Sequence, residues 1–129
     1  MIKVGLVLSG GGARALAHLG VLQGLEDLGI RPAAIAGASA GAVIGAMYAS
    51  GNTPAAILSA IKKNASTGLI NKLSPGSGLF TAGGLTALFK ATKLPAHFED
   101  LNMPLWVAAT DLVTCQPVIF QKVCYINRS

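Results

Sequence analysis

Acidic residues are scarce in this sequence of 129 residues, in which five Asp and Glu stand against ten Lys and Arg and the formal net charge is +5. No acid occurs between Asp27 and Glu99, although six cations do: Arg31, Lys62, Lys63, Lys72, Lys90 and Lys93. Such a basic middle segment favours contact with an anionic surface. Solvated helix faces are an equally good interpretation of the same charges.

Aromatic residues are also few, at 5% of the chain. Only Phe80 and Phe89 lie among the lysines of the basic segment, and no RNP, helix-turn-helix or zinc pattern is visible. Because nucleic-acid binding usually pairs cations with stacking aromatics, nucleic acid is not predicted as a partner. Phospholipid head groups fit at least as well, so we expect peripheral membrane contact through the five lysines of that segment.

Cysteine is limited to Cys115 and Cys124, without C-x-x-C spacing or companion ligands for a metal. We therefore predict free thiols, and neither a metal nor a cofactor is implied. The start, "MIKVGLVLSGGG", lacks the long apolar segment and the cleavage site of a signal peptide, which predicts a cytoplasmic protein, peripheral to the membrane at most.

Only one long stretch without charge suggests a possible membrane span, residues 32–51. Its 20 residues are enough to span a bilayer, and Gly41 and Gly45 form a small-xxx-small pair. Four glycines and eight alanines nevertheless make the stretch only weakly hydrophobic, and no basic cluster flanks it. A buried strand and helix are therefore favoured over a membrane span.

Apolar periodicity predicts two successive strand–helix units. A β-branched run at residues 2–8 stops at a glycine cluster, and residues 13–28 then show helical spacing, with Gly29 as the C-terminal cap. Residues 33–39 and 40–49 repeat the order of strand and helix. Two such units imply a parallel sheet and hence an α/β fold.

The remainder of the chain adds four more elements and no repeat or domain linker. Thr53, followed by proline, predicts the start of a helix that continues to about Asn64. The pattern then loosens through a glycine- and proline-containing turn. Beyond it we expect a short amphipathic helix at 85–93 and strands at 103–111 and 116–121.

The stretch "IAGASAGAV", residues 35–43, contains the pattern G-x-S-x-G at Gly37, Ser39 and Gly41. A serine on a sharp strand-to-helix turn is exposed as a nucleophile, and its neighbours must then be very small. The helix that follows directs its N–H groups, beginning with that of Ala40, toward a developing negative charge. Because the motif alone is short enough to arise by chance, the predicted strand before it and helix after it carry the argument.

A second candidate element, "SGGGARALAHLG", follows the first predicted strand. Gly10, Gly11 and Gly12 offer backbone N–H groups to an anion, and Arg14 is placed to brace the loop. The same loop with Ala15 satisfies G-x-G-x-x-[GA], so a nucleotide site is the alternative. That site needs an acid at the end of the second strand, where this sequence has "GASAG". A glycine-run oxyanion hole beside a serine elbow instead predicts acyl transfer.

A base for Ser39 is not evident. An α/β-hydrolase triad runs Ser, then Asp or Glu, then His along the chain, and His97 precedes both Asp100 and Asp111. His18 lies in the first predicted helix and is interpreted as a packed or capping residue. A carboxylate acting directly as base is the alternative, and Asp111, at the end of the third predicted strand, is the weak candidate. It could equally orient a loop.

Four blocks in this order resemble the bacterial patatin-like phospholipases: "GGGARALAHLGVL", "GASAGAVIGAMYASG", "FEDLNMPLWVAATDL" and "PVIF". The resemblance covers about residues 3–121. It implies a three-layer α/β fold, with a mainly parallel sheet flanked by helices, and a serine hydrolase with a Ser-Asp dyad that acts on phospholipid or other acyl esters. Ser39 matches the nucleophile of that family, and the oxyanion-hole loop is matched by Gly10, Gly11, Gly12 and Arg14.

Two departures from the family pattern bear on activity. Ala15 stands where the family loop commonly has glycine, and none of Asp27, Asp100 and Asp111 is followed by glycine, as the dyad aspartate of a D-G-G or D-G-A motif would be. We therefore expect residues 1–129 to form a single patatin-like domain, incomplete at its C-terminal side and with little turnover. The alternative is an inactive fragment that binds a lipid surface or a protein, or that associates with itself through an uncovered sheet edge.

Overall fold

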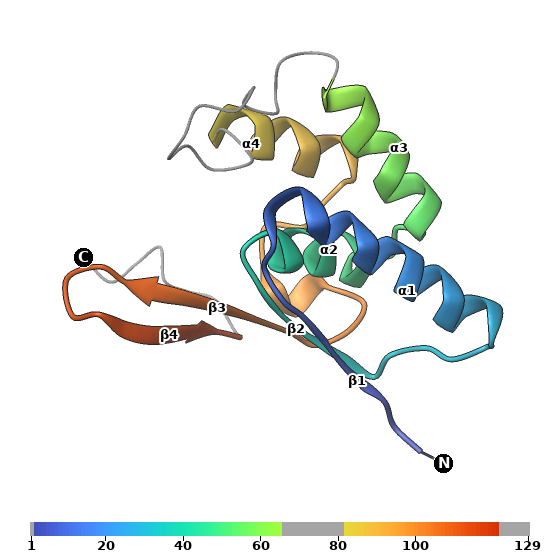
Figure 1. The fold of residues 1–129 in the computed structure, drawn as a ribbon, viewed down its shortest axis with the longest axis horizontal. Coiled ribbons are helices and arrows are strands. Elements are labelled where there is room, and N and C mark those ends of the chain that lie inside the picture. The colour runs from blue at the N-terminus through green and yellow to red at the C-terminus, as the bar shows by residue number, and fades with distance from the viewer. Residues whose placement is uncertain (1, 66–81, 122–129) are drawn as a thin grey trace.

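The computed structural model describes residues 2–65 and 82–121 of the chain (Figure 1). The elements in chain order are β1 (Gly5–Leu8), a 3-10 helix (Gly12–Leu16), α1 (Ala17–Asp27), β2 (Ala34–Ala38), α2 (Ala40–Ala49), α3 (Pro54–Ala65), α4 (Ala82–Ala91), a second 3-10 helix (Phe98–Asp100), β3 (Leu105–Asp111) and β4 (Gln116–Phe120). Every strand and helix predicted from the sequence is present. The first predicted helix differs in that its opening turn is the 3-10 helix.

Within the described residues the strands form one sheet in the order β1-β2-β3-β4. β1, β2 and β3 are parallel, and β4 returns antiparallel to β3. Leu8 pairs with Gly37, and Gly37 pairs with Val107, so the carboxyl ends of β1 and β2 lie side by side next to β3. The predicted α/β fold with a mainly parallel sheet is confirmed.

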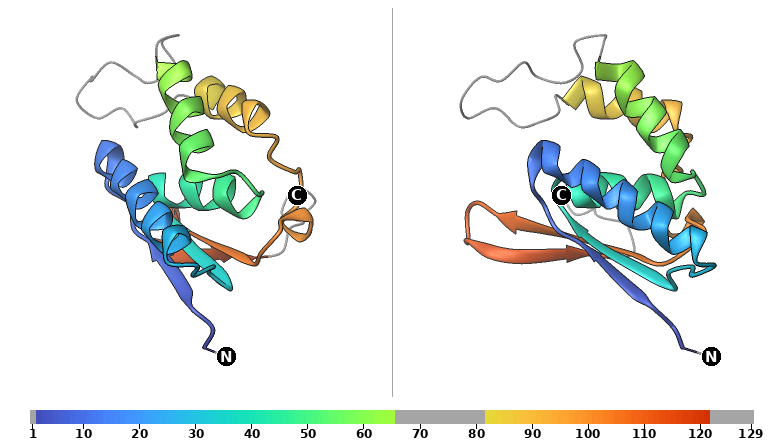
Figure 2. Two further views of the ribbon diagram at one scale, coloured as in Figure 1. Left: turned by 90° about the vertical axis from the view of Figure 1, so that its right-hand side faces the viewer. Right: turned by 45° about the vertical axis from the view of Figure 1, so that its right-hand side comes forward.

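The helices of the described residues lie on one side of this sheet (Figure 2). α1 and α2 connect strands that follow one another across the sheet in the same direction, and right-handed crossovers of this kind place both helices on one face. α3 and α4 pack together as a second tier above them. The opposite face carries a row of Val7, Ala36 and Trp106, and Val7 is 77% exposed. The described residues thus provide the sheet and one helical layer of the predicted three-layer arrangement.

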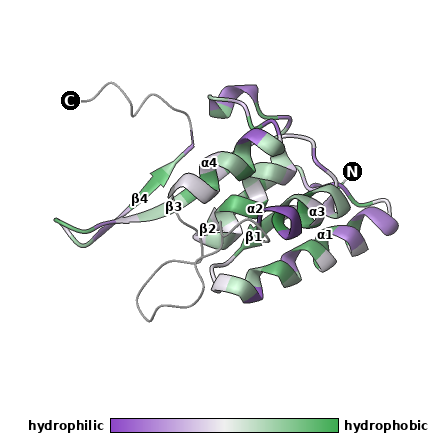
Figure 3. Ribbon diagram, turned by 90° about the horizontal axis from the view of Figure 1, so that it is seen from above, coloured by the Kyte–Doolittle hydropathy of each residue, from purple (hydrophilic) through white to green (hydrophobic). Residues whose placement is uncertain are grey.

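α2 is the central helix of the core, and hydrophobic residues predominate along it, whereas they alternate with hydrophilic ones along α1 (Figure 3). Its glycines let it approach the sheet closely, since a Cβ at Gly45 would lie 3.0 Å from Cγ2 of Ile35. The other helices contribute fully buried side chains to the same core: Leu22, Ile57 and Leu88. The uncharged stretch 32–51 therefore forms β2 and a helix buried within the protein. In the part of the chain that the structure describes, no helix combines the length and apolar character needed to cross a bilayer.

The predicted helix caps are confirmed. Gly29 has φ 70°, and the N–H of Ile30 donates to the carbonyl of Leu25 at 2.8 Å, which satisfies the end of α1. At the start of α3, the hydroxyl of Thr53 accepts the N–H of Ala56 at 3.1 Å. These caps fix where the chain leaves α1 for β2 and where it turns into α3.

Two side chains tie α2 to its neighbours. The Tyr48 hydroxyl donates to Oε1 of Glu26 in α1 at 3.1 Å, and burial, followed by this bond, raises the pKa of Tyr48. The Asn52 amide, just beyond α2, donates to the carbonyls of Met47 at 3.0 Å and Thr92 at 2.9 Å. The Asn52 bonds join the ends of α2 and α4, and so hold α4 over the sheet.

Candidate active site

Ser39 stands on the sharp turn between β2 and α2 with an exposed side chain, φ 52° and ψ −130°. A residue other than glycine is strained at such a positive φ, and the surrounding structure has to maintain it. The adjacent glycines make the turn possible, because a Cβ on Gly37 would lie 2.7 Å from Cα of Ala42 and one on Gly41 would collide with the carbonyl oxygen of Leu8. The strand, turn and helix that a nucleophile elbow requires are all present.

The N-terminus of α2 begins directly after Ser39. The Ser39 carbonyl accepts the N–H groups of Ala42 at 2.9 Å and Val43 at 3.2 Å, which forms the first turn of the helix. The earlier N–H groups, those of Ala40 and Gly41, belong to the set that a helix leaves without an intrahelical acceptor. A negative charge that develops on an atom bound to Ser39 is therefore close to the positive end of the helix dipole.

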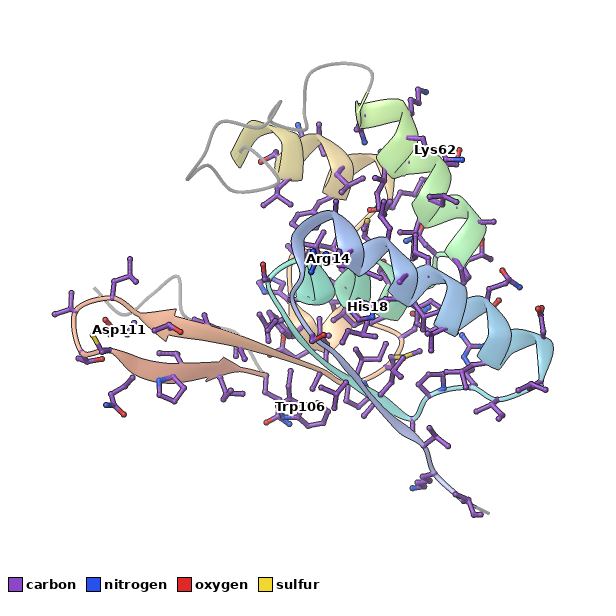
Figure 4. All side chains as sticks on the ribbon, in the orientation of Figure 1. Arg14, His18, Lys62, Trp106 and Asp111 are labelled. Carbon is purple, nitrogen blue, oxygen red and sulfur yellow. The ribbon has the colours of Figure 1, made fainter. Side chains whose placement is uncertain are left out.

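The glycine loop packs against this elbow. A Cβ on Gly10 would lie 3.1 Å from Cβ and 3.7 Å from Oγ of Ser39, so the loop lies closer to the serine than a side chain at this position would comfortably allow. Gly12, with φ 56°, starts the 3-10 helix, and the main-chain N–H of Arg14 donates to the carbonyl of Gly11 at 3.1 Å. Figure 4 shows Arg14 at the start of this helical segment, beside α2. The structure thus brings together the two elements that the sequence proposed for an oxyanion hole and a nucleophile.

His18 also reaches this loop, as a structural contact from α1. Its Nε2 lies 2.8 Å from the carbonyl oxygen of Ser9, the residue between β1 and Gly10. Because a carbonyl only accepts hydrogen bonds, Nε2 carries the proton in this contact. The bond fits the capping role that the sequence suggested for His18.

Asp111 lies at the turn of the β3–β4 hairpin, well to the side of the helices (Figure 4). Its Oδ1 accepts the N–H groups of Val113 at 2.8 Å and Thr114 at 3.3 Å, and these bonds lower the pKa of the carboxyl group. Ala38, next to the serine, pairs with Ala108, so Asp111 is three residues farther along β3. The structure therefore gives Asp111 a turn-forming contact, while its service as a base stays a prediction.

An apolar cavity of about 470 Å³ opens beside Ser39. Its floor is the side of α2 with Ala42, Val43 and Ala46, and its walls come from Phe89 of α4, the segment 94–98, and β3. Ser39 and His97 are the polar side chains among the residues that line it. The cavity therefore offers an apolar surface that begins at the candidate nucleophile.

Nothing in the sequence predicted this cavity. The segment "LPAHF", residues 94–98, carries apolar residues around a proline, but nothing in its spacing shows that it lies over α2. Its place depends on Asn52, which holds the end of α4, and on the N–H of Asn102, which donates to the carbonyl of Ala49 at 2.8 Å. Contacts between residues so distant in the chain leave no local pattern.

The remaining predicted residues lie outside the elbow. Lys62, Lys63, Lys90 and Lys93 are exposed in the last turns of α3 and α4 or just after α4, and Lys72 lies outside the described residues. Cys115 is free and exposed at the hairpin, whereas Cys124 lies outside the described residues. Across residues 2–65 and 82–121, no three His, Cys, Asp or Glu side chains are grouped as ligands of a metal.

The sequence matches the family described as patatin-like phospholipase over residues 6–119. This range includes the glycine loop, the elbow and all four strands, apart from the first residue of β1 and the last residue of β4. The chain belongs to the patatin-like phospholipase family. Hydrolysis of lipid esters is the function that this membership supports at the level of the family.

Relatives extend this assignment over nearly the whole chain. An uncharacterised NTE family protein of Mycobacterium bovis is 32% identical over 122 residues, which are 93% of this chain and 34% of that protein. Lysophospholipase NTE1 of Cryptococcus neoformans is 53% identical over 47 residues, which are 36% of this chain and 3% of that protein. This patatin-like chain thus spans about a third of the length of its mycobacterial relative.

The same fold occurs in a solved complex of full-length SpcU with full-length ExoU from the type III secretion system of Pseudomonas aeruginosa. This patatin-like chain superimposes on one chain of that complex with a TM-score of 0.53 and 20% identity, over 92% of its own length and 34% of the other chain. At that identity the likeness concerns the fold alone.

Proposed function

We propose that the domain formed by these residues is a lipid acyl hydrolase in which Ser39 is the nucleophile. The position of Ser39 carries the proposal: it is exposed, held at φ 52°, packed against the glycine loop, and part of the lining of an apolar cavity. A serine that served only to cap α2 would need neither the strained turn nor an apolar surface in front of it.

The proposed reaction begins with attack of Ser39 Oγ on the carbonyl carbon of an acyl ester. The hydroxyl proton passes to a base, a bond forms between Oγ and the carbonyl carbon, and the carbonyl oxygen becomes negative. The N–H groups of Gly10, Gly11, Gly12 and Ala40 are the proposed donors to that oxygen. Collapse of the intermediate expels the alcohol with a proton and leaves an acyl ester on Ser39, which water then hydrolyses.

The apolar cavity supports a fatty acyl chain as the acyl part of the substrate. Each methylene group removed from water contributes about 0.8 kcal/mol, so a cavity lined by alanine, valine, leucine and phenylalanine side chains favours a long chain over acetate. Relatives of this chain include proteins named lysophospholipase. We therefore propose a phospholipid or lysophospholipid whose scissile carbonyl lies at Ser39 and whose chain lies along α2.

Slow turnover is part of the proposal. In the described residues Asp111 serves a hairpin turn, and His97 lines the cavity without a hydrogen bond to Ser39. A nucleophile without its base loses most of its rate, because the two act as a unit. Activated reagents, whose leaving groups need little assistance, are expected to react with Ser39 even so.

The decisive experiment is intact-mass analysis of the chain after incubation with a fluorophosphonate. Ser39→Ala is the test variant, and Ser59→Ala, which removes an exposed serine of α3, is the matched control. We expect one phosphonyl adduct on the wild-type and Ser59→Ala proteins and none on Ser39→Ala. An unlabelled wild-type protein, or an adduct that survives in Ser39→Ala, would refute Ser39 as the nucleophile.

A second proposal, lipid-surface binding without turnover, is favoured by the exposed lysines at the ends of α3 and α4. Cations at these sites also complement the helix dipoles, so their position alone does not require a membrane. Binding to anionic vesicles together with an absence of labelling would favour this second function over hydrolysis.

A further inference from the structure

We propose that His18 is a positioning residue that sets the direction of the first N–H of the oxyanion hole. The proposal rests on the proposed function, because the loop that His18 contacts is the one assigned to oxyanion binding. The observation behind it is the 2.8 Å hydrogen bond from His18 Nε2, in α1, to the carbonyl oxygen of Ser9.

Because Ser9 and Gly10 share one peptide unit, a bond that fixes the Ser9 carbonyl also fixes the Gly10 N–H. In a planar trans peptide the C=O and the next N–H point in opposite directions. A proton donor that holds the Ser9 carbonyl toward α1 therefore holds the Gly10 N–H away from α1. Gly10 is the loop residue that packs on Ser39, with Cβ of the serine 3.1 Å from where a Gly10 Cβ would stand.

The loop itself does little to fix this direction. Among the described residues, the N–H groups of Gly10 and Gly11 donate to no other residue. Glycine imposes few limits on the backbone, so residues 10 and 11 themselves add little to hold the direction of the Ser9–Gly10 peptide. A donor that is free to rotate is a poor oxyanion donor, because catalysis gains from groups that need no reorganisation when charge develops.

The Ser9 carbonyl also lies close to the start of α2. A Cβ on Gly41 would lie 2.5 Å from that oxygen, so α2 passes close to it. The Ser9 carbonyl, just beyond β1, thus has both His18 of α1 and Gly41 of α2 beside it. The His18 imidazole donates the hydrogen bond to the carbonyl, and the missing side chain of Gly41 leaves room for it. The orientation of the loop therefore depends on the packing of both helices.

The test compares three substitutions at His18 in the full 129-residue chain. His18→Gln places an amide N–H where Nε2 stands, His18→Asn stops short of Ser9, and His18→Leu removes the donor. Gln23→Ala, an exposed change on the same helix, is the control. The rate constant for fluorophosphonate labelling of Ser39 and the melting temperature are measured for each variant.

Labelling by the Leu and Asn variants is expected to slow by about 10- to 100-fold, somewhat less than the loss seen when an oxyanion donor is removed outright. His18→Gln is expected to recover most of the rate, and Gln23→Ala to keep it. A purely structural His18 would instead give labelling rates that follow the melting temperature, with the Asn variant restored by stabilising conditions. That result would overturn the proposal.

Amide NMR signals of Gly10 and Gly11 provide a readout that does not depend on activity. We expect broadened or doubled signals in His18→Asn and sharp single signals in the wild-type and His18→Gln proteins. Unchanged signals in His18→Asn would overturn the positioning role. If the wild-type protein were not labelled at Ser39, the proposed function would fail, while the glycine signals would still decide whether His18 orders the loop.

Discussion

The strained backbone of Ser39 depends on the glycines on either side of it. The residue is held at φ 52°, which costs about 1–3 kcal/mol. Gly37 and Gly41 let β2 and α2 approach each other and the end of β1 so closely that a side chain at either position would collide with main-chain atoms. The chemistry proposed for this site therefore depends on residues that have no reactive group, and the glycines are the place to test it.

Gly41→Ala is expected to disrupt the elbow. The added methyl group would collide with the carbonyl oxygens of Leu8 and Ser9, which are main-chain atoms of β1 and its exit and cannot move cheaply. Overpacking of this kind costs about 1–3 kcal/mol. Urea unfolding of the variant should show a loss of that size, together with a loss of labelling at Ser39.

Gly20→Ala is the matched control for that change. Gly20 lies in the interior of α1, and a Cβ there would meet no atom within 4 Å. Alanine in a helix interior is more stable than glycine by about 0.5–1 kcal/mol, so this variant should be more stable than the wild-type protein. Equal stability of the two alanine variants would contradict the close packing of the elbow.

At the scale of elements, the sequence predicted those starts and ends of helices that neighbouring residues determine. The predicted bounds of α2 agree with the structure, because the residues around Ser39 mark both the end of the strand and the start of the helix. Gly29 likewise marked the end of α1. The 3-10 turn before α1 and the position of residues 94–98 over α2 were not predicted. Both depend on packing between distant parts of the chain. The one-sided arrangement of helices likewise follows from strand order, which no single element specifies.

The β3–β4 hairpin offers a pH test at this scale. The pKa of Asp111 is lowered from its ordinary value of 3.8, first by the N–H of Val113 and then by that of Thr114. Because the folded pKa lies below the unfolded value, the carboxylate stabilises the hairpin above the unfolded pKa, and this contribution is lost as pH falls through the folded pKa. The amide NMR signals of Val113 and Thr114 should therefore titrate with a midpoint below 3.8.

Asp111→Asn is the companion variant for this titration. Its amide keeps an oxygen as acceptor but cannot ionise, so the two amide signals should lose their dependence on acid pH. A midpoint at or above the ordinary value in the wild-type protein would mean that the turn does not hold the carboxylate. Loss of ester turnover in Asp111→Asn would instead identify Asp111 as the base for Ser39.

At the scale of the molecule, the described residues place a group of exposed lysines and an exposed apolar part of the sheet on opposite sides. The second helical tier carries exposed lysines at the ends of α3 and α4, whereas the open face of the sheet presents Val7 at 77% exposure and Ile119 at 55%. Self-association through the open side of the sheet stays a prediction. The lysines, in contrast, are placed on the helical tier whose α4 supplies Phe89 to the cavity. If these lysines contact an anionic bilayer, the helical tier that contributes to the cavity is the side that faces the lipid.

Lys62→Gln and Lys3→Gln together test whether the helical tier faces the membrane or whether binding depends on net charge alone. Each removes one positive charge from an exposed lysine. Lys62 lies in the last turn of α3 (Figure 4), whereas Lys3 belongs to the stretch before β1, which runs to the N-terminus away from the helices (Figure 1). A lysine near an anionic membrane contributes about 1 kcal/mol, so Lys62→Gln should weaken binding to phosphatidylserine-containing vesicles by roughly fivefold at low salt. Lys3→Gln should bind nearly as the wild-type protein does. Vesicle sedimentation at two salt concentrations measures both, and equal losses would show that attraction depends on net charge and has no preferred face.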